Sequence, residues 1–361
     1  KFRGAFGYNS RPDCPSRSTT GSIMPRRSTG CFGCPKWRAT CHPGIMWTTT
    51  PIMGRRRKSG QKIDGWVILD KAFGMTSTAA VGAVRRIFDA NKAGHAGTLD
   101  PLASGVLPIA LGEATKTLPY VVDTEKSYQF TLKWGEATTT DDREGEITDR
   151  SDARPSETEI IAGLIDFIGE IEQVPPAFSA IKVNGERAYD MARRGDTVKL
   201  EARRIWIKRF ELVEMRDADQ AVFNVISGKG AYMRSLARDL ALRVGTVGHI
   251  AELRRTAVGR FAEEDAISLD ELDAIGHSPA ASGALLPVET PLDDIPALAL
   301  TEQEAARLRN GQAVSLLRKL DLERISAFDD GETVLATTSG KPVALTKYSA
   351  GEVRPVRVLN V

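Results

Sequence analysis

The segment Asn91–Leu111, NKAGHAGTLDPLASGVLPIAL, constrains the fold more than any other part of the chain. It places one carboxylate, Asp100, directly before Pro101, and a residue before proline is held in an extended conformation. Two preceding glycines permit the close approach of a ligand or of another backbone. The apolar run Val106–Leu111 predicts a buried strand that anchors the loop. An acid fixed in an open loop on a rigid strand suits catalysis, whereas an ordinary Asp-Pro turn is the alternative interpretation.

The composition is that of a globular chain, because 361 residues with 42% hydrophobic and 27% charged side chains are enough for two domains. No apolar run approaches the roughly 18 residues that cross a bilayer, so we expect a soluble protein without a membrane partner. The formal net charge is +2. Overall charge therefore does not indicate a nucleic-acid partner, and a local basic surface is required for that inference.

The first 60 residues predict a disordered basic extension, because they combine low hydrophobicity with scattered Pro and Gly. They hold all four cysteines: Cys14, Cys31, Cys34 and Cys41. A body without cysteine fits a reducing compartment, so we expect a cytoplasmic protein. The Cys-x-x-Cys pair with the following Cys41-His42 has a zinc-like spacing, but no helix or strand pattern surrounds it. We therefore expect no metal site.

The natural start of the chain is a separate hypothesis. We expect translation to begin at Met53, just before the basic run Arg55–Lys58. Tryptic peptides of the native protein from before Met46 would refute this. The basic run itself has two interpretations, a solvated tail and a weak RNA tether.

Hydrophobic periodicity and capping signals place helices and strands along residues 61–361. Ser156 and Glu159, for example, form a capping box at the start of one helix. The predicted strands are 66–69, 106–111, 127–134, 198–213 and 220–227, and the predicted helices are 76–88, 113–122, 156–168, 233–244 and 301–310. Strands interspersed with helices, some of them adjacent in sequence, indicate a mixed α+β domain.

Proline and glycine divide this body into parts. Residues 61–290 form the main domain, and paired prolines and glycines around a short helix mark 173–198 as an excursion from its sheet. Residues 135–147 predict a polar loop. A link with prolines at 291 and 296 leads to a small domain at 296–361, which is too short to host an enzyme.

The segment GHAGTLDPLASGVLPIALGEATK closely resembles the catalytic segment of the TruB family, the bacterial tRNA pseudouridine-55 synthases. LDKAFGMTS, KSYQF, GAYMRSLARDLA and HIAELRRTAVGRF are similar to further motifs of that family. Two positions depart from it, since Ala72 replaces a proline and Thr139 an aspartate, while Asp142 is kept. The resemblance implies a pseudouridine-synthase fold with a mixed, largely antiparallel central sheet flanked by helices. It also implies a flexible thumb at 173–198 and a small C-terminal PUA-like, RNA-binding β-rich domain.

The resemblance implies three catalytic residues. Asp100 would be the nucleophile, and Tyr128 would stack on the base and act as a candidate general base. Arg234 would form an ion pair with Asp100. Sequence position alone points the same way for Arg234, because a cation in the first turn of a helix is disfavoured by the helix dipole and suggests a nearby anion. The alternatives are a plain core tyrosine and a solvated arginine.

Other residues would bind the RNA substrate by the same resemblance. His95 would fill the space left by a flipped uridine, and Leu253 would pack under the active loop. Lys71 would position the aspartate or a phosphate, with an ordinary surface lysine as the alternative. Six arginines would meet phosphates. Arg187, Arg193 and Arg194 belong to the thumb-like segment, and Arg254, Arg255 and Arg260 belong to the motif HIAELRRTAVGRF, the last of the main domain.

The implied reaction isomerises a uridine in the T-loop of tRNA to pseudouridine by base flipping, and an isomerisation needs no cofactor or metal. We expect a monomer with tRNA as its partner and no obligate protein partner. The alternative is a non-catalytic tRNA-binding or RNA-folding protein on the same fold. An RNA methyltransferase would need a nucleotide-binding glycine loop after a strand, which we do not find, and the thumb-like segment argues against a guide-RNA-dependent synthase.

Overall fold

The structure is a computed structural model that describes residues 60–183, 185–276 and 283–361. The predictions for the basic extension, the cysteine pattern, the start at Met53 and the basic run lie outside the described residues. No helix in the described part of the chain combines the length and the apolar character needed to span a membrane.

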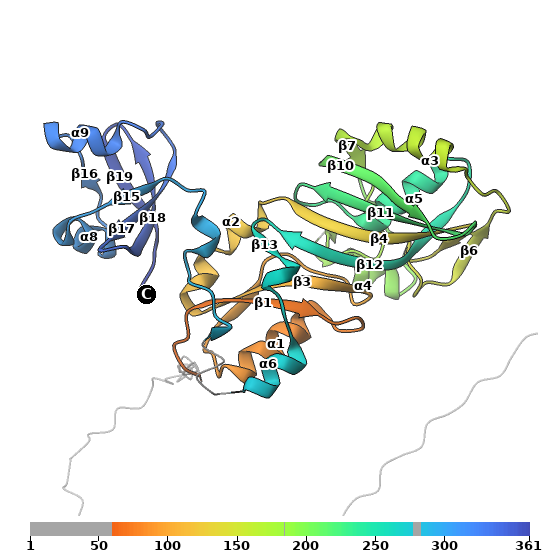
Figure 1. The fold of residues 1–361 in the computed structure, drawn as a ribbon, viewed down its shortest axis with the longest axis horizontal. Coiled ribbons are helices and arrows are strands. Elements are labelled where there is room, and N and C mark those ends of the chain that lie inside the picture. The colour runs from red at the N-terminus through yellow and green to blue at the C-terminus, as the bar shows by residue number, and fades with distance from the viewer. Residues whose placement is uncertain (1–59, 184, 277–282) are drawn as a thin grey trace, which may run out of the picture. The chain divides into compact units, whose positions relative to one another are not determined.

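The main domain is built on one mixed sheet, in which most neighbouring strands are antiparallel (Figure 1). The strand order is β14-β1-β3-β12-β4-β11-β10-β7, with β13 beside β12 and β2 beside β3. Only two of its pairs within the described residues are parallel, β1 with β14 and β12 with β3. The strands are β1 (Gly65–Lys71), β2 (Ala93–His95), β3 (Ala103–Leu111), β4 (Lys126–Trp134), β7 (Gly169–Gln173), β10 (Arg203–Met215), β11 (Gln220–Ser227), β12 (Gly248–Val258), β13 (Phe261–Ala262) and β14 (Ile267–Ser268).

Both faces of β1 and β3 are buried, as their continuous apolar runs predict. On one face Leu69 and Leu107 join the large core cluster together with residues of α1 (Ser77–Ile87) and α5 (Met233–Arg243). On the other face Ile68 and Val106 pack with a second cluster that includes α2 (Leu118–Val122). The base of the Asp100 loop is therefore a strand held from both sides.

Helix ends follow their local signals. Thr76 caps α1 by accepting from Ala79, and Ser156 and Glu159 form the predicted capping box of α3 (Glu157–Leu164). The predicted helix 113–122 is instead two pieces, η1 (Gly112–Lys116) and α2, since Pro119 has no N–H to continue the first. Three further short elements are η2 (Ile165–Phe167), η3 (Glu263–Asp265) and α6 (Leu269–Ile275).

Two predictions for the strands were wrong in detail. The polar loop 135–147 contains β5 (Glu136–Thr138), which pairs with β6 (Ile147–Arg150). These strands are short and polar, so periodicity does not reveal them. Strand β10 begins at Arg203 rather than 198, because the residues before it belong to the excursion from the sheet.

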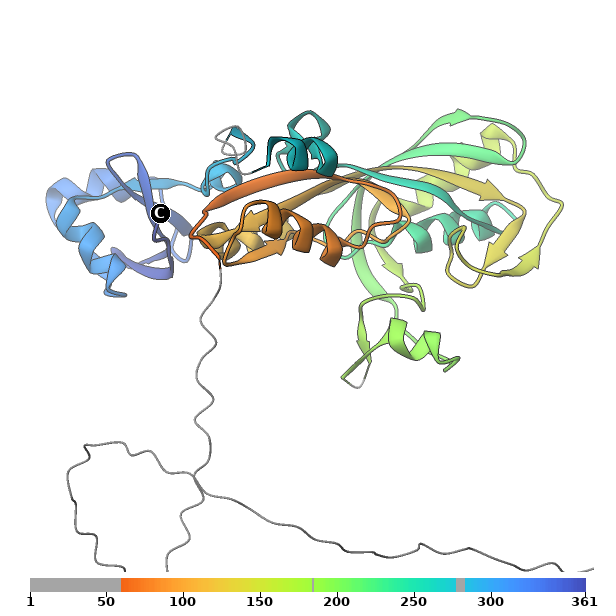
Figure 2. The same ribbon diagram turned by 90° about the horizontal axis from the view of Figure 1, so that it is seen from below.

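That excursion connects β7 to β10, which are neighbouring antiparallel strands. It consists of β8 (Lys182–Val183), β9 (Glu186–Arg187) and α4 (Ala188–Arg193). Figure 2 shows it in light green, standing away from the sheet. A segment inserted between two paired strands can change its conformation without breaking the sheet.

The C-terminal part has its own five-stranded sheet, in the order β15-β17-β18-β19-β16, and its own core cluster. Thr301 and Glu304 form a capping box at the start of α8, and Gly311, with φ of 76°, follows the end of this helix. The elements are η4 (Thr290–Leu292), β15 (Ala297–Ala299), α8 (Glu302–Arg309), β16 (Val314–Ser315), α9 (Lys319–Ile325), β17 (Thr333–Thr338), β18 (Lys341–Ser349) and β19 (Glu352–Val358).

Candidate active site

The loop between β2 and β3 carries Asp100, and hydrogen bonds fix its backbone on both sides. The hydroxyl of Ser77 donates to the carbonyl of Leu99 and accepts from its N–H, both at 2.8 Å. The carbonyl of Pro101 accepts from the N–H of Gly74 at 2.8 Å. The Asp100 side chain is 33% exposed. The predicted bend therefore presents a carboxylate at the surface of a rigid loop.

Lys71 lies behind this bend with no exposed surface. Its ammonium group donates to the carbonyls of Ala72, Met75 and Pro101. Burial lowers the pKa of Lys71 to about 8, and the charge of Asp100 acts in the opposite direction. These bonds tie the loop after β1 to the Asp100 loop, so the geometry favours positioning of the aspartate over contact with a phosphate.

Arg234, in the first turn of α5, is brought to Asp100 across 134 residues of sequence. Its Nε and Nη2 both lie 2.8 Å from Oδ2 of Asp100. Its remaining donors bind the carbonyls of Thr140 and Phe178, both at 3.0 Å. The side chain is only 5% exposed. A planar guanidinium fixed on all sides holds the carboxylate in one orientation.

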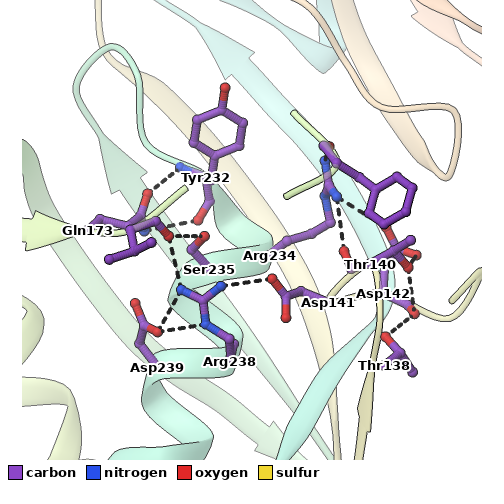
Figure 3. A network of polar contacts seen from close by, with 12 residues as sticks. Thr138, Thr140, Asp141, Asp142, Gln173, Tyr232, Arg234, Ser235, Arg238 and Asp239 are labelled. Atoms are coloured by element: carbon purple, nitrogen blue, oxygen red, sulfur yellow. Dashed lines mark hydrogen bonds and ion pairs between the residues drawn. The ribbon is translucent and has the colours of Figure 1, made fainter. Parts of the chain in front are cut away.

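The loop after β5 supplies further partners of Arg234 (Figure 3). Asp142 is buried, lies 3.7 Å from Arg234 and accepts from the Thr140 hydroxyl at 2.6 Å. Thr139, which replaces the family aspartate, accepts from the N–H of Glu146 and so closes the loop. Asp142 is therefore in place to orient Arg234 even though the first acid is missing.

Arg238, one turn further along α5, attaches the same loop to the helix. It donates to Asp141 at 2.9 Å and to the carbonyl of Val174 at 3.0 Å. Burial raises the pKa of Asp141, and the charges of Arg238 and Arg234 oppose this. Figure 3 shows both arginines reaching from α5 toward the loop. Two successive turns of one helix thus fix the loop that surrounds Asp100.

A cavity of about 280 Å³ opens beside Asp100, and Tyr128 and Leu253 belong to its wall. Tyr128 comes from β4 and Leu253 from β12, which pair directly with each other. A second cavity, of about 340 Å³, lies between Asp100, Arg234 and the excursion that carries Arg193. Asp100 therefore borders both spaces. The first has Tyr128 and Leu253 in its wall, and the second is lined by three arginines and three acids, Asp100 among them.

The remaining predicted binding residues are placed differently. His95 is on β2, outside the sets of residues that line these two cavities, and burial together with the charge of Arg255 lowers its pKa. Arg193 stacks on the ring of Tyr189 at 4.3 Å and faces the second cavity. Arg194, its neighbour, is bound to two acids and is absent from that cavity's lining.

Arg254 and Arg255 are adjacent, yet they differ completely. Arg254 is half-exposed and binds Asp70 at 3.0 Å as well as Glu263. Arg255 is 1% exposed. The expectation that Arg255 meets a phosphate is wrong, because its side chain is buried beneath the first cavity rather than at the surface. Strand alternation could have indicated this, since Arg255 shares a face with Leu253 and not with Arg254.

Sequence reasoning also missed Tyr232 and Lys126, which line the first cavity. Burial raises the pKa of Tyr232, and the negative charge of Asp100 adds to this. Burial lowers the pKa of Lys126 to about 8. Both residues lie inside motifs that carried other assignments, each two positions before an assigned residue, Arg234 and Tyr128 respectively. In the described residues no group of three or more His, Cys, Asp or Glu side chains is arranged to hold a metal ion.

Comparison with known proteins decides the family. The model of the N-terminal domain of TruB family pseudouridylate synthases matches residues 85–233. The model of the tRNA pseudouridylate synthase B C-terminal domain matches residues 234–293. A Rhodospirillum rubrum protein named tRNA pseudouridine synthase B is 56% identical over 306 residues, covering 85% of this chain and 99% of the relative. This chain belongs to the TruB family.

Other TruB family members and solved structures agree. A Caulobacter vibrioides protein with the same name is 51% identical over 307 residues, covering 85% of this chain and 99% of the relative. The crystal structure of a Cbf5-Nop10-Gar1 complex contains a chain that is 26% identical, with a TM-score of 0.62 and coverage of 82% and 84%. The predicted α+β pseudouridine-synthase fold with a small C-terminal PUA-like β domain is confirmed.

Proposed function

We propose that this TruB family member isomerises a uridine in the T-loop of tRNA to pseudouridine. The relatives named tRNA pseudouridine synthase B support the substrate class. The observation that supports the chemistry most is the partly exposed carboxylate of Asp100, held at 2.8 Å by the buried Arg234 at the edge of an open cavity. A fixed, ionised carboxylate beside a base-sized space is what attack on a flipped nucleoside requires.

The reaction can be written with all atoms conserved. Asp100 attacks C1′ of the ribose, and the N1–C1′ bond breaks with its electron pair on the uracil. The base turns, C5 bonds to C1′, and the carboxylate leaves. C5 then loses its proton and N1 gains one, so the product is an isomer of the substrate. Arg234 binds the Asp100 carboxylate through Nε and Nη2 and so fixes its direction of attack.

The cavity walls match the needs of the displaced base. Tyr128 offers a ring for stacking and an oxygen for proton transfer, and Leu253 completes the apolar wall. Extrusion of a base costs a few kcal/mol and is least for a base already in a loop. Arg187 and Arg193, which the excursion contributes to the second cavity, would contact the RNA backbone. We extend the binding surface to the C-terminal domain at 296–361, whose fold is PUA-like.

The test uses unmodified transcribed tRNA and a matched tRNA whose T-loop target uridine is cytidine. Chemical mapping should place one pseudouridine in the T-loop of the first and none in the second. A comparable signal elsewhere, or none in either RNA at saturating enzyme, would reject the proposed substrate.

We also propose a cytoplasmic, monomeric enzyme without an obligate protein partner. The absence of cysteine from residues 61–361 fits a reducing compartment. Light scattering of the purified chain, with and without tRNA, should give one protein copy per particle. A stable dimer would reject this part.

A further inference from the structure

The loop after β5 contacts α5 through three consecutive residues, Thr140, Asp141 and Asp142. The first and the third contact Arg234, because the carbonyl of Thr140 accepts from its Nη1 at 3.0 Å and Oδ2 of Asp142 lies 3.7 Å from the same nitrogen. The middle residue, Asp141, accepts from Nη1 of Arg238 at 2.9 Å (Figure 3). The contacts of the two arginines therefore alternate along one short stretch of chain.

The backbone of Asp141 is held in an uncommon conformation. Its φ is 58°, in the left-handed region, which aspartate tolerates better than most residues. Its carbonyl accepts from the N–H of Ile250 on β12 at 3.1 Å. Strand β12 thus fixes the main chain at Asp141, and Arg238 fixes the side chain.

Arg238 also holds the beginning of the excursion, directly after β7. Its Nη2 donates to the carbonyl of Val174 at 3.0 Å, and the hydroxyl of Ser235 donates to the same carbonyl at 2.8 Å. The side chains of Arg238 and Asp141 are 26% and 16% exposed, and a partly buried ion pair is screened less by water than an exposed one. One guanidinium therefore joins α5, the loop after β5 and the start of the excursion.

We infer that Asp141 and Arg238 are positioning residues for the reaction, and that they act on Asp100 through Arg234. This rests on the proposed function. Neither residue forms a hydrogen bond or an ion pair with Asp100 in the described part of the chain. Their ion pair instead holds the loop that carries two partners of Arg234. Those partners keep the guanidinium in the orientation that directs Asp100 toward the ribose.

A purely structural role of the ion pair predicts a different result. A pair that only stabilises the fold has an effect that adds to the effect of a residue elsewhere in the site. A pair that acts through Arg234 loses its effect on the rate once Arg234 no longer holds Asp100 in place. A double-mutant cycle on the rate of the reaction separates these two cases.

Three single variants test the ion pair. Arg238→Gln keeps N–H donors but removes the charge, and Asp141→Asn keeps the size and the tolerance of the left-handed region. Arg238→Lys keeps the charge but cannot reach both Asp141 and Val174 with a planar fork. Arg238→Gln should lower the single-turnover rate at saturating enzyme by about tenfold, and Asp141→Asn by a few-fold, because small displacements of reacting groups are costly. Arg238→Lys should recover part of this loss.

Binding is measured separately. The affinity of these variants for tRNA, followed by filter binding, should stay within about threefold of wild type, because an interaction that serves the reaction step lowers the rate and not the binding. Rates that fall only in proportion to a loss of affinity would overturn the inference.

The deciding measurement combines Arg238→Gln with Arg234→Lys. We expect the double variant to react within about twofold of Arg234→Lys alone, because the group through which Arg238 acts is already gone. The matched control is Arg243→Gln, in the last turn of α5, whose ion pair with Asp166 is exposed. It should leave the rate unchanged in both backgrounds. Losses that multiply in the double variant would show that Arg238 acts independently of Arg234 and would overturn the inference.

Thermal unfolding followed by circular dichroism shows whether each variant folds. If Arg238→Gln does not fold, the same cycle is run with Asp141→Asn, whose loss of rate must also vanish in the Arg234→Lys background. An unchanged rate in the folded variants overturns the inference and leaves the proposed function intact. If the wild-type enzyme forms no pseudouridine, the proposed function itself fails, so the two failures are distinguishable.

Discussion

Arg234 and Arg255 are both buried, and each lines one of the two cavities that Asp100 borders, but only Arg234 has anionic partners among the described residues. Arg234 contacts Asp100 at 2.8 Å and lies 3.7 Å from Asp142. Arg255 donates to the carbonyls of Val106 and Gly97. A guanidinium bound to a carboxylate fixes the orientation of that side chain, whereas a guanidinium bound to backbone carbonyls ties two segments of the chain together. Arg234 therefore orients the Asp100 side chain, and Arg255 joins the loop that carries Asp100 to β3.

The largest effect is expected on the paired side. Arg234→Lys keeps the charge but cannot reproduce two contacts to one carboxylate oxygen together with bonds to Thr140 and Phe178. We expect the single-turnover rate to fall by about 100-fold or more. tRNA affinity, measured by filter binding, should change by only a few-fold. A lysine variant with a rate within threefold of wild type would show that orientation by the fork is unimportant.

The second prediction concerns Lys71, the buried cation behind the Asp100 loop. Burial lowers the pKa of Lys71 from 10.5 to about 8. Between these values the unfolded chain keeps a proton that the folded chain has lost, so the free energy of unfolding rises with pH. We expect the wild type to gain about 1–3 kcal/mol relative to Lys71→Met between pH 7.5 and 10.

Denaturant unfolding at each pH measures this difference. Lys208→Met is the control, because Lys208 is exposed and forms only a surface ion pair with Glu125. A difference between wild type and Lys71→Met that is independent of pH would mean that Lys71 is not held in a disfavoured charged form.

The sequence analysis predicted the contact of Arg234 with Asp100, but it did not predict that Arg255 is buried. The unusual first-turn position of Arg234 and its motif indicated an anion, and the structure brings it to Asp100. Arg255 was grouped with Arg254 as a phosphate contact, because a pair of arginines on a strand looks like a surface feature. The overlooked signal was strand alternation, which places Arg255 on the same face as the apolar Leu253 and Arg254 on the opposite face.

Local sequence signals predicted some helix ends but not every break in a helix or every short strand. The capping box of α3 was readable because all of its atoms lie within four residues. The division of 113–122 at Thr117 was missed although Pro119 signalled it. The pairing of β5 with β6 depends on bonds between short polar strands, which carry no hydrophobic pattern.

The smallest predicted effect is on tRNA affinity, and it concerns two neighbouring arginines at the surface of the excursion, one without and one with acidic partners. Arg193 stacks on Tyr189, whereas Arg194 is bound to Glu186 and Asp196. We expect Arg193→Ala to weaken tRNA binding by a few-fold and to reduce the slope of log affinity against log salt by about one. Arg194→Ala should have a smaller effect, because its charge is already neutralised. Titrations at several salt concentrations measure both, and equal effects would contradict this assignment.

The most direct test of the central claim replaces one oxygen by nitrogen. Asp100→Asn keeps the size and the fixed loop but removes the negative charge that Arg234 holds. tRNA binding should stay within a few-fold of wild type, and mapping after prolonged incubation should show no pseudouridine above background. Formation of pseudouridine by the Asn variant at a measurable fraction of the wild-type rate would contradict the account.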